Sequence, residues 1–165
     1  MNNIFTRASI REFTNQAVED EKLEDVLHAA MAAPSAGNQQ PWEFYVITNK
    51  EVIKQLAGVH VYSKPTAHAT MAIVPCYHLG GRYPQYAQLD LAAAVQNMMI
   101  QADALGLGTV WIGIAPEEVR MQRVAEILSL PERLTAFAIV PIGYPSKEKP
   151  VQPNRFEKNR IHYLK

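Results

Sequence analysis

Arg7, Ser9 and Arg11 alternate near the start of the chain, so in an extended segment their side chains share one face. Two guanidinium groups that flank a hydroxyl can bind a phosphate and also donate hydrogen bonds to sugar hydroxyls. The spacing alone also describes two solvated arginines ahead of a helix, and by itself it favours that simpler interpretation.

A second polar cluster lies in the loop 34–42, where Pro34 and Pro41 bracket consecutive amide side chains at 38–40. The prolines restrict the backbone while the amides present donors and acceptors. Such a set suits the pyrimidine edge of a flavin ring, where carbonyl and N–H groups alternate. Turn-forming residues in an ordinary helix-to-strand loop explain the same sequence, so both interpretations stay open.

Other common sites are absent from the sequence. It has no glycine-rich dinucleotide fingerprint between a strand and a helix, and no phosphate loop ending in Gly-Lys-Ser/Thr. The run 106–108, Gly-Leu-Gly, is typical of a helix stop. The five histidines lack metal-ligand spacing, and Cys76 lies in a strand-like run that favours a buried, inert thiol. We therefore expect no metal site and no catalytic side chain.

Composition narrows the partners. The chain has 165 residues, 48% of them hydrophobic, and its 16 basic and 16 acidic side chains cancel. This balance argues against nucleic acid or an anionic membrane as a partner. The N-terminal residues do not form a secretory signal, and no apolar run reaches the roughly 20 residues that cross a bilayer. We expect a soluble, cytoplasmic protein with one domain over residues 1–165.

The elements that must position these residues follow from hydrophobic spacing. Apolar residues recur every three or four positions after residue 18, which predicts a helix that ends before Pro34. The remaining predictions are a strand at 42–47, a short helix at 50–57, a buried strand at 71–79, a long helix at 86–105 and strands at 109–112 and 134–142.

Three details complete this layout. Pro75 inside the strand 71–79 predicts a sheet edge or an irregularity. A helix opening at Pro116 should turn Val119, Val124, Ile127 and Leu128 inward. The helix 86–105 is apolar over so much of its surface that it should be central, and the polar segment 146–165 should form a C-terminal arm. The class is α+β, a modest sheet covered by helices.

Taken together, the chain resembles the nitroreductase family. Residues 7–13 match its opening Arg-x-Ser-x-Arg-x-Phe signature. The other segments that carry the resemblance follow in the family's order: 33–42, 90–98, 104–113, 141–145 and 154–163. The resemblance covers nearly the whole chain. It implies a mostly antiparallel central sheet, with the long helix at the core of a homodimer.

The resemblance also implies roles for residues on the N-terminal segment and the tail. Arg7 and Arg11, together with Ser9, would hold the phosphate and ribityl chain of FMN. Arg155 from the C-terminal arm would join them.

Further positions follow in the same way. The flavin ring would be lined by Pro34, Ser35, Asn38 and, as a further candidate, Gln40. Backbone N–H groups near Gly113 and Ile114 would face flavin N5 and O4, and Gly143 would pass close to the cofactor. Each FMN would touch both subunits.

The expected activity is that of an NAD(P)H-dependent FMN oxidoreductase. A hydride would pass from NADH or NADPH through flavin N5 to a nitroaromatic, quinone or similar acceptor, by ping-pong kinetics. The flavin would carry the chemistry, while the protein supplies binding and orientation. Three alternatives remain: a flavin store or sensor with little turnover, a specialised relative that dehalogenates or fragments flavin, and a domain without a cofactor.

Overall fold

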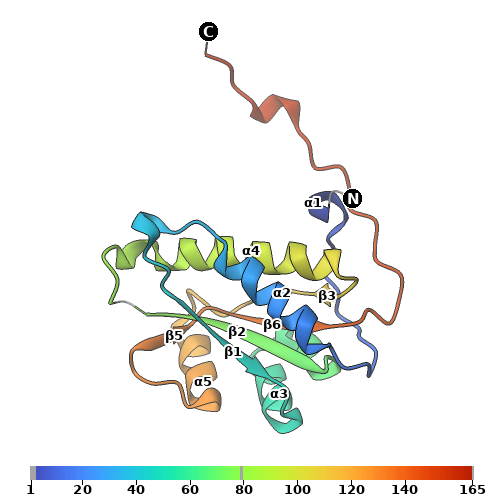
Figure 1. Ribbon diagram of the computed structural model, residues 1–165, viewed down its shortest axis with the longest axis vertical. Helices are drawn as coiled ribbons and strands as arrows, with labels where there is room; N and C mark the ends of the chain where they lie inside the picture. Colours follow the sequence, from blue (N-terminus) through green and yellow to red (C-terminus); the bar gives the residue numbers. More distant parts are fainter. Residues whose placement is uncertain (1–2, 79, 165) are drawn as a thin grey trace.

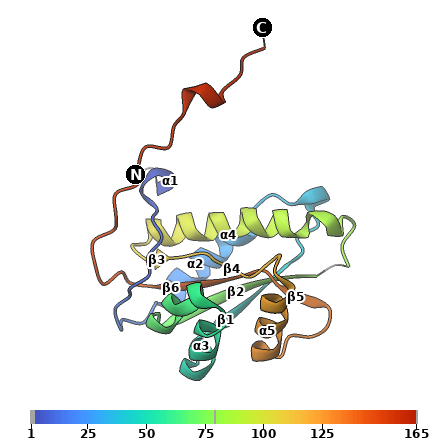
Figure 2. The ribbon, with the colours of Figure 1, turned by 180° about the vertical axis from the view of Figure 1, so that it is seen from behind.

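The computed structural model describes residues 3–78 and 80–164. One sheet lies between two layers of helices (Figures 1 and 2). The helices are α1 (Asn3–Thr6), α2 (Asp20–Met31), α3 (Lys50–Ala57), α4 (Ala87–Ala104) and α5 (Glu118–Leu128), with 3₁₀ segments η1 (Ala36–Asn38), η2 (Val61–His68), η3 (Pro84–Tyr86) and η4 (Lys158–Arg160). The strands are β1 (Trp42–Ile47), β2 (Met71–His78), β3 (Gly108–Thr109), β4 (Ile112–Gly113), β5 (Leu134–Ala136) and β6 (Ala138–Gly143).

The strand order is β1-β2-β6-β3, with β4 also paired to β6 and β5 to β2. Every pair of named strands is antiparallel, which confirms the expected sheet. The N-terminal segment extends the sheet beyond β3 through a parallel bridge between Ser9 and Thr109.

Strand β2 forms the centre of both hydrophobic cores. Its residues Met71, Ile73 and Tyr77 pack with α2 and α4 on one face. Ala72, Val74 and Cys76 face the other way, into the core that includes α3 and α5. Alternation along a strand produces this division, because successive side chains point to opposite faces. Burial raises the pKa of the Cys76 thiol to about 12, so it is the inert thiol that we expected.

Pro75 explains why the predicted strand 134–142 is two strands. It lies on a central strand, between the part of β2 that pairs with β6 and the part that pairs with β5. At that break the Phe137 N–H donates to the Pro75 carbonyl over 2.9 Å. The expected irregularity at Pro75 is therefore present, while an edge position is not.

Two other predictions need correction, and Leu79, predicted to end the strand 71–79, lies outside the described residues. The segment 109–112 is not one strand but β3 and β4, separated by Val110 and Trp111. On α5, Val124 is buried as predicted, but Val119 is 82% exposed. Val119 lies in the first turn of α5, and its apolar character alone did not place it in the core.

Helix α4 crosses one face of the sheet and is buried over most of its length, with Leu91, Val95 and Met98 fully inaccessible. The C-terminal arm, residues 146–164, leaves the end of the sheet and extends away from the body (Figures 1 and 2). In the described residues, no helix combines the length and hydrophobicity that crossing a bilayer requires.

Candidate functional site

The N-terminal segment lies along β3 in an extended conformation. The Ile10 N–H donates to the Thr109 carbonyl over 2.8 Å. Ala8 and Ile10 are buried against the body, so Arg7, Ser9 and Arg11 share the opposite, more exposed face. The predicted alternation of these three residues is confirmed.

Two glycines set how closely this segment approaches the sheet. A Cβ atom on Gly108 would lie 2.7 Å from Cβ of Ile10, closer than such atoms come in proteins. Gly143 pairs with Gly108 across the sheet, and a Cβ there would lie 3.2 Å from the Phe13 ring. The sheet thereby places Gly143 beside the segment that carries the arginines.

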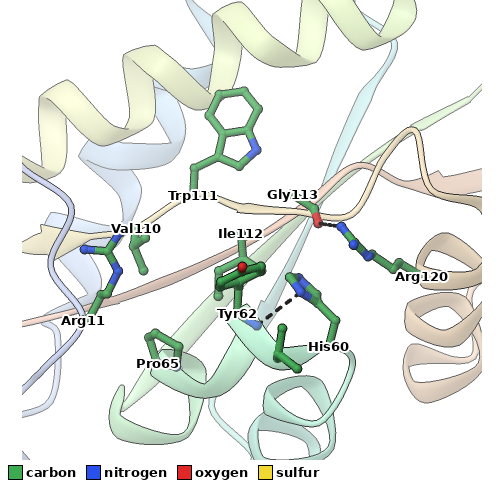
Figure 3. A pocket seen from close by; sticks show the side chains of 10 residues that line it. Arg11, His60, Tyr62, Pro65, Val110, Trp111, Ile112, Gly113 and Arg120 are labelled. Atoms are coloured by element: carbon green, nitrogen blue, oxygen red, sulfur yellow. Dashed lines mark hydrogen bonds between the residues drawn. The ribbon is translucent and has the colours of Figure 1, made fainter.

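A pocket of about 420 Å³ opens where this segment, β4 and η2 meet (Figure 3). Its wall combines basic, aromatic and apolar residues: Arg11, His60, Val61, Tyr62, Pro65, Val110, Trp111, Ile112, Gly113 and Arg120. Gly113 is exposed, and a Cβ on it would meet nothing within 4 Å, so the space over its backbone is open. The side chain of Ile114 is fully buried, which leaves only its backbone near the pocket.

The pocket is electropositive although the chain has no net charge. Arg11 and Arg120 line it, and none of its lining residues is acidic. Burial, followed by the charge of Arg120, lowers the pKa of His60, so the imidazole between them is neutral at pH 7. Such a site favours anions and groups that gain negative charge during a reaction.

The loop 34–41 is held at the N-terminal end of α4, where Asp90 lies in the first turn. The buried carboxylate of Asp90 accepts from the Ala36 N–H over 2.9 Å and from the Gln39 side-chain amide over 2.7 Å. Gln39 also donates to the Tyr83 carbonyl and accepts from the Tyr83 N–H. The loop is thereby fixed from within by residues of its own chain.

This fixed loop has an unusual backbone. Gly37, Asn38 and Gln40 all have φ between 46° and 56°, a region that non-glycine residues rarely adopt. The Ser35 hydroxyl accepts from the Gln40 N–H over 3.0 Å. Asn38 and Gln40 are exposed, and within the described chain their side chains make no hydrogen bond, so both remain available to a ligand.

The predicted site residues form two separate groups. We call Arg7, Ser9, Arg11, Gly113 and Gly143 the arginine half-site, and Pro34, Ser35, Asn38 and Gln40 the loop half-site.

Two buried aspartates on α4 mark their separation. Asp90 holds the loop half-site, and Asp103 accepts from Thr6, next to the arginine half-site. They are thirteen residues apart, so about 20 Å of helix lies between them. One chain does not bring the two half-sites together.

Arg155 belongs to the C-terminal arm. The arm passes the arginine half-site where the Gln152 side chain donates to the Arg7 carbonyl over 2.5 Å. Lys149 forms an ion pair with Asp103 at 2.6 Å. Arg155 follows three residues after Gln152 and is exposed.

Sequence reasoning missed several residues of the site. Gln39 and Asp90 hold the loop half-site, and Arg120 lines the pocket, yet none was singled out. A signal existed for Arg120, since it lies only seven residues after Gly113, beyond a short turn. No comparable signal links Gln39 to Asp90, because 51 residues separate them.

Another hollow, of about 800 Å³, lies between α3 and the end of η2, and no predicted site residue lines it. Among the described residues, no group of three or more His, Cys, Asp or Glu side chains is arranged to hold a metal ion. The pocket beside the arginine half-site therefore remains the candidate site.

Comparison with known proteins agrees with this geometry. The chain is 40% identical over 96% of its length, and 94% of the relative's, to an Archaeoglobus fulgidus protein provisionally named NADH dehydrogenase/NAD(P)H nitroreductase. A solved Clostridium acetobutylicum structure, provisionally named NADH oxidase, matches 99% of each chain with 38% identity and a TM-score of 0.95.

A second solved structure was determined in complex with FMN. It is a provisionally assigned nitroreductase from Desulfovibrio desulfuricans, with 30% identity, coverage of 99% of this chain and 94% of that one, and a TM-score of 0.83. The model of the nitroreductase family matches residues 4–75 and 61–144. The chain therefore belongs to the nitroreductase family.

Proposed function

We propose that this protein is an NAD(P)H-dependent FMN oxidoreductase that acts as a homodimer. Each active site combines the arginine half-site of one copy with the loop half-site of the other. The observation that carries the proposal is the separation of the two half-sites along α4. A twofold axis that crosses α4 at right angles near its middle would bring opposite ends of the two helices together, and twofold dimers are the commonest assemblies.

The arm supports an assembly of two copies. Its apolar side chains Val151, Phe156, Tyr163 and Leu164 are each at least 70% exposed. An isolated chain gains nothing by holding these groups in water, whereas a partner surface would bury them. The arm extends away from its own body (Figure 2), so these side chains could pack on a partner.

The residues present fit FMN. Arg7 and Arg11 offer guanidinium groups for a phosphate, with the Ser9 hydroxyl between them, and Arg155 of the arm adds a further cation. In the second copy, Asn38 and Gln40 present unpaired amides suited to the polar edge of the ring. The solved Desulfovibrio desulfuricans relative binds FMN, which supports this assignment.

FMN supplies the redox chemistry, accepting a hydride from NAD(P)H and returning electrons to an acceptor. The chain's own task is to bind and orient it. Arg11 and Arg120 favour negative charge in the pocket, while the neutral His60 and the apolar wall exclude water around it. Open space over Gly113 leaves its backbone accessible.

We assign the acceptor to planar, electron-poor compounds such as nitroaromatics and quinones, which the aromatic and apolar lining of the pocket suits. Donor and acceptor use the same face in turn, so the kinetics are ping-pong. Initial-rate lines for the two substrates in double-reciprocal plots should then be parallel, and intersecting lines would contradict a shared site.

The first test is a visible spectrum of the purified protein with added FMN, followed by NADH or NADPH without oxygen. Flavin bands that bleach with the nicotinamide and return with a quinone would support the proposed activity. Bands that persist would favour a flavin-binding protein without reductase turnover. A protein that binds no FMN after reconstitution would overturn the assignment.

The shared site has its own test. Sedimentation should give a dimer, and truncation of the arm after residue 150 should weaken both the dimer and its affinity for FMN. A control variant changes Lys54, exposed on α3, to glutamine, because this removes one positive charge away from both half-sites. A monomer that binds FMN fully would contradict the two-copy site.

A further inference from the structure

Arg120 lines the pocket but belongs to neither half-site. It lies on α5, and its guanidinium donates one long hydrogen bond, 3.4 Å, to the Gly113 carbonyl (Figure 3). Among the described residues no carboxylate forms an ion pair with it. A guanidinium carries several N–H donors in a planar fork, so most of them remain available to a ligand.

The two arginines of the pocket lie on opposite walls. Figure 3 shows Arg11 on the N-terminal segment at one side and Arg120 on α5 at the other, with Ile112 between them. Arg11 belongs to the arginine half-site that would hold FMN. Arg120 is therefore a second cation, held by a different element at the far end of the cavity.

The pocket wall between the arginines is largely apolar. Val61, Tyr62 and Pro65 come from η2, and Ile112 comes from β4. Ring faces and branched apolar side chains of this kind pack against a planar aromatic molecule. The proposed function places the FMN ring beside this wall, so an acceptor would lie against the exposed face of that ring, with a substituent within reach of the Arg120 fork.

From this juxtaposition we infer that Arg120 selects acceptors that carry a carboxylate on an aromatic or similarly planar ring. The inference rests on the proposed function, because it names the class of acceptor for that same pocket. A guanidinium binds a carboxylate through two parallel hydrogen bonds, which orient the ring as well as attract it.

The position of Arg120 favours an acceptor over the nicotinamide donor. In NAD(P)H a ribose separates the nearest phosphate from the reacting ring, whereas in an aromatic acid the carboxylate is attached to the ring itself. Arg120 lies against Gly113, whose backbone adjoins the open centre of the pocket. A cation so close to the centre suits a short, ring-attached anion.

The experiment compares 4-nitrobenzoate with 4-nitrobenzamide as acceptors for the FMN-loaded enzyme. They share a ring and a nitro group and differ in charge. Their intrinsic reactivities differ, so the quantity to compare is the ratio of kcat/KM for the acid to that for the amide. Substituting Arg120→Gln should lower this ratio by about tenfold, as expected for loss of a charge-assisted hydrogen bond.

A binding measurement accompanies the kinetics. Benzoate should perturb the flavin absorbance of the oxidised enzyme and bind about tenfold more weakly to the Arg120→Gln variant. Benzamide should bind both equally. The matched control is Arg123→Gln, which removes the same charge one turn further along α5, where Arg123 donates to the Val59 carbonyl outside the pocket. This control should change neither the kcat/KM ratio nor the affinity for benzoate.

Three outcomes would overturn the inference. Equal loss with both acceptors would show that Arg120 acts on the flavin, and a shifted midpoint potential would accompany it. A slower bleaching by NAD(P)H alone would assign Arg120 to the donor. An unchanged ratio would mean that it contacts neither. If NAD(P)H never bleaches the flavin of the unaltered enzyme, the proposed function fails instead, before any acceptor is added.

Discussion

The two ends of α4 each carry a buried aspartate, and the two carboxylates are satisfied in different ways. Asp90 accepts from neutral donors, the Ala36 N–H and the Gln39 amide. Asp103 accepts from the Thr6 hydroxyl and from the charged Lys149 of the arm. The partners of Asp90 are themselves held by the loop, whereas Lys149 is a third exposed and stands at the start of an extended segment.

This difference separates a preformed half-site from a dependent one. The loop half-site owes its shape to hydrogen bonds that uncharged donors make to the buried Asp90 carboxylate, which salt screens little. The arm contacts the arginine half-site through the hydrogen bond from Gln152 to the Arg7 carbonyl. It is also held beside that half-site by the ion pair between Lys149 and Asp103. The position of the arm therefore affects the arginine half-site much more than the loop half-site. In the proposed dimer, the partner would act on the arginine half-site through the arm.

The largest expected effect comes from Asp90→Ala. It leaves the Ala36 N–H and the Gln39 amide without their acceptor, so stability should fall by about 3 kcal/mol and the loop should open. Thermal unfolding and the dissociation constant of FMN report the two effects. Asp90→Asn should be intermediate, because its amide can accept from Ala36 but presents a donor to Gln39. A fully stable Asp90→Ala variant would contradict the preformed loop.

Gly108→Ala should be next. The added methyl group meets Ile10 and forces the N-terminal segment away from β3, at about 2 kcal/mol. Affinity for FMN should fall more than for a variant of equal stability altered away from both half-sites. Gly106→Ala is not a clean control, because Gly106 has φ of 78°. Val124→Ala, in the core between α5 and the sheet, serves as the destabilised control away from both half-sites. Unchanged FMN affinity in Gly108→Ala would contradict a role of the N-terminal segment in binding the cofactor.

Asp103→Asn should have a smaller effect on stability, about 1 kcal/mol, since Lys149 is partly solvated. Its main consequence should be a freer arm, seen as faster tryptic cleavage within residues 147–160. Salt should speed cleavage of the unaltered protein, because it screens the ion pair, and should have little further effect on Asp103→Asn. A cleavage rate that salt does not change would weaken the contrast between the two ends of α4.

The smallest effect belongs to Gln152→Ala, which removes one hydrogen bond to the Arg7 carbonyl. About 0.5 kcal/mol of stability is expected to be lost, together with a slight increase in arm cleavage. The matched change at the other end, Gln39→Ala, removes bonds to both Asp90 and Tyr83 and should cost clearly more. Equal losses would argue that the two half-sites are fixed to the same degree.

Periodicity predicted the parts of the fold that depend on local chemistry. The alternation of Arg7, Ser9 and Arg11 survives because Ala8 and Ile10 between them are buried. The long apolar helix is central, as its composition required. Pro75 predicted an irregularity in its strand, because proline has no N–H group to donate to a neighbouring strand. In each case the signal in the sequence is local, a spacing or a single residue, even though the residues it packs against are distant.

The rest depends on contacts between distant residues. Asp90 was visible only as one polar residue on an apolar helix, and nothing nearby pointed to its partners in the loop. The exposure of Val119 follows from where α5 meets the sheet, which its own sequence does not encode. Likewise, the distance between the half-sites depends on the folded chain, which places them at opposite ends of α4.

In the proposed dimer, that separation has a genetic consequence. Consider one chain damaged only in its arginine half-site, for example at Arg11, and another damaged only in its loop half-site, at Asn38. Each alone assembles with two defective sites. A mixed pair places both lesions in one site and leaves the other entirely intact. Two inactive alleles expressed in the same cell should therefore complement each other, and recover activity that neither provides by itself.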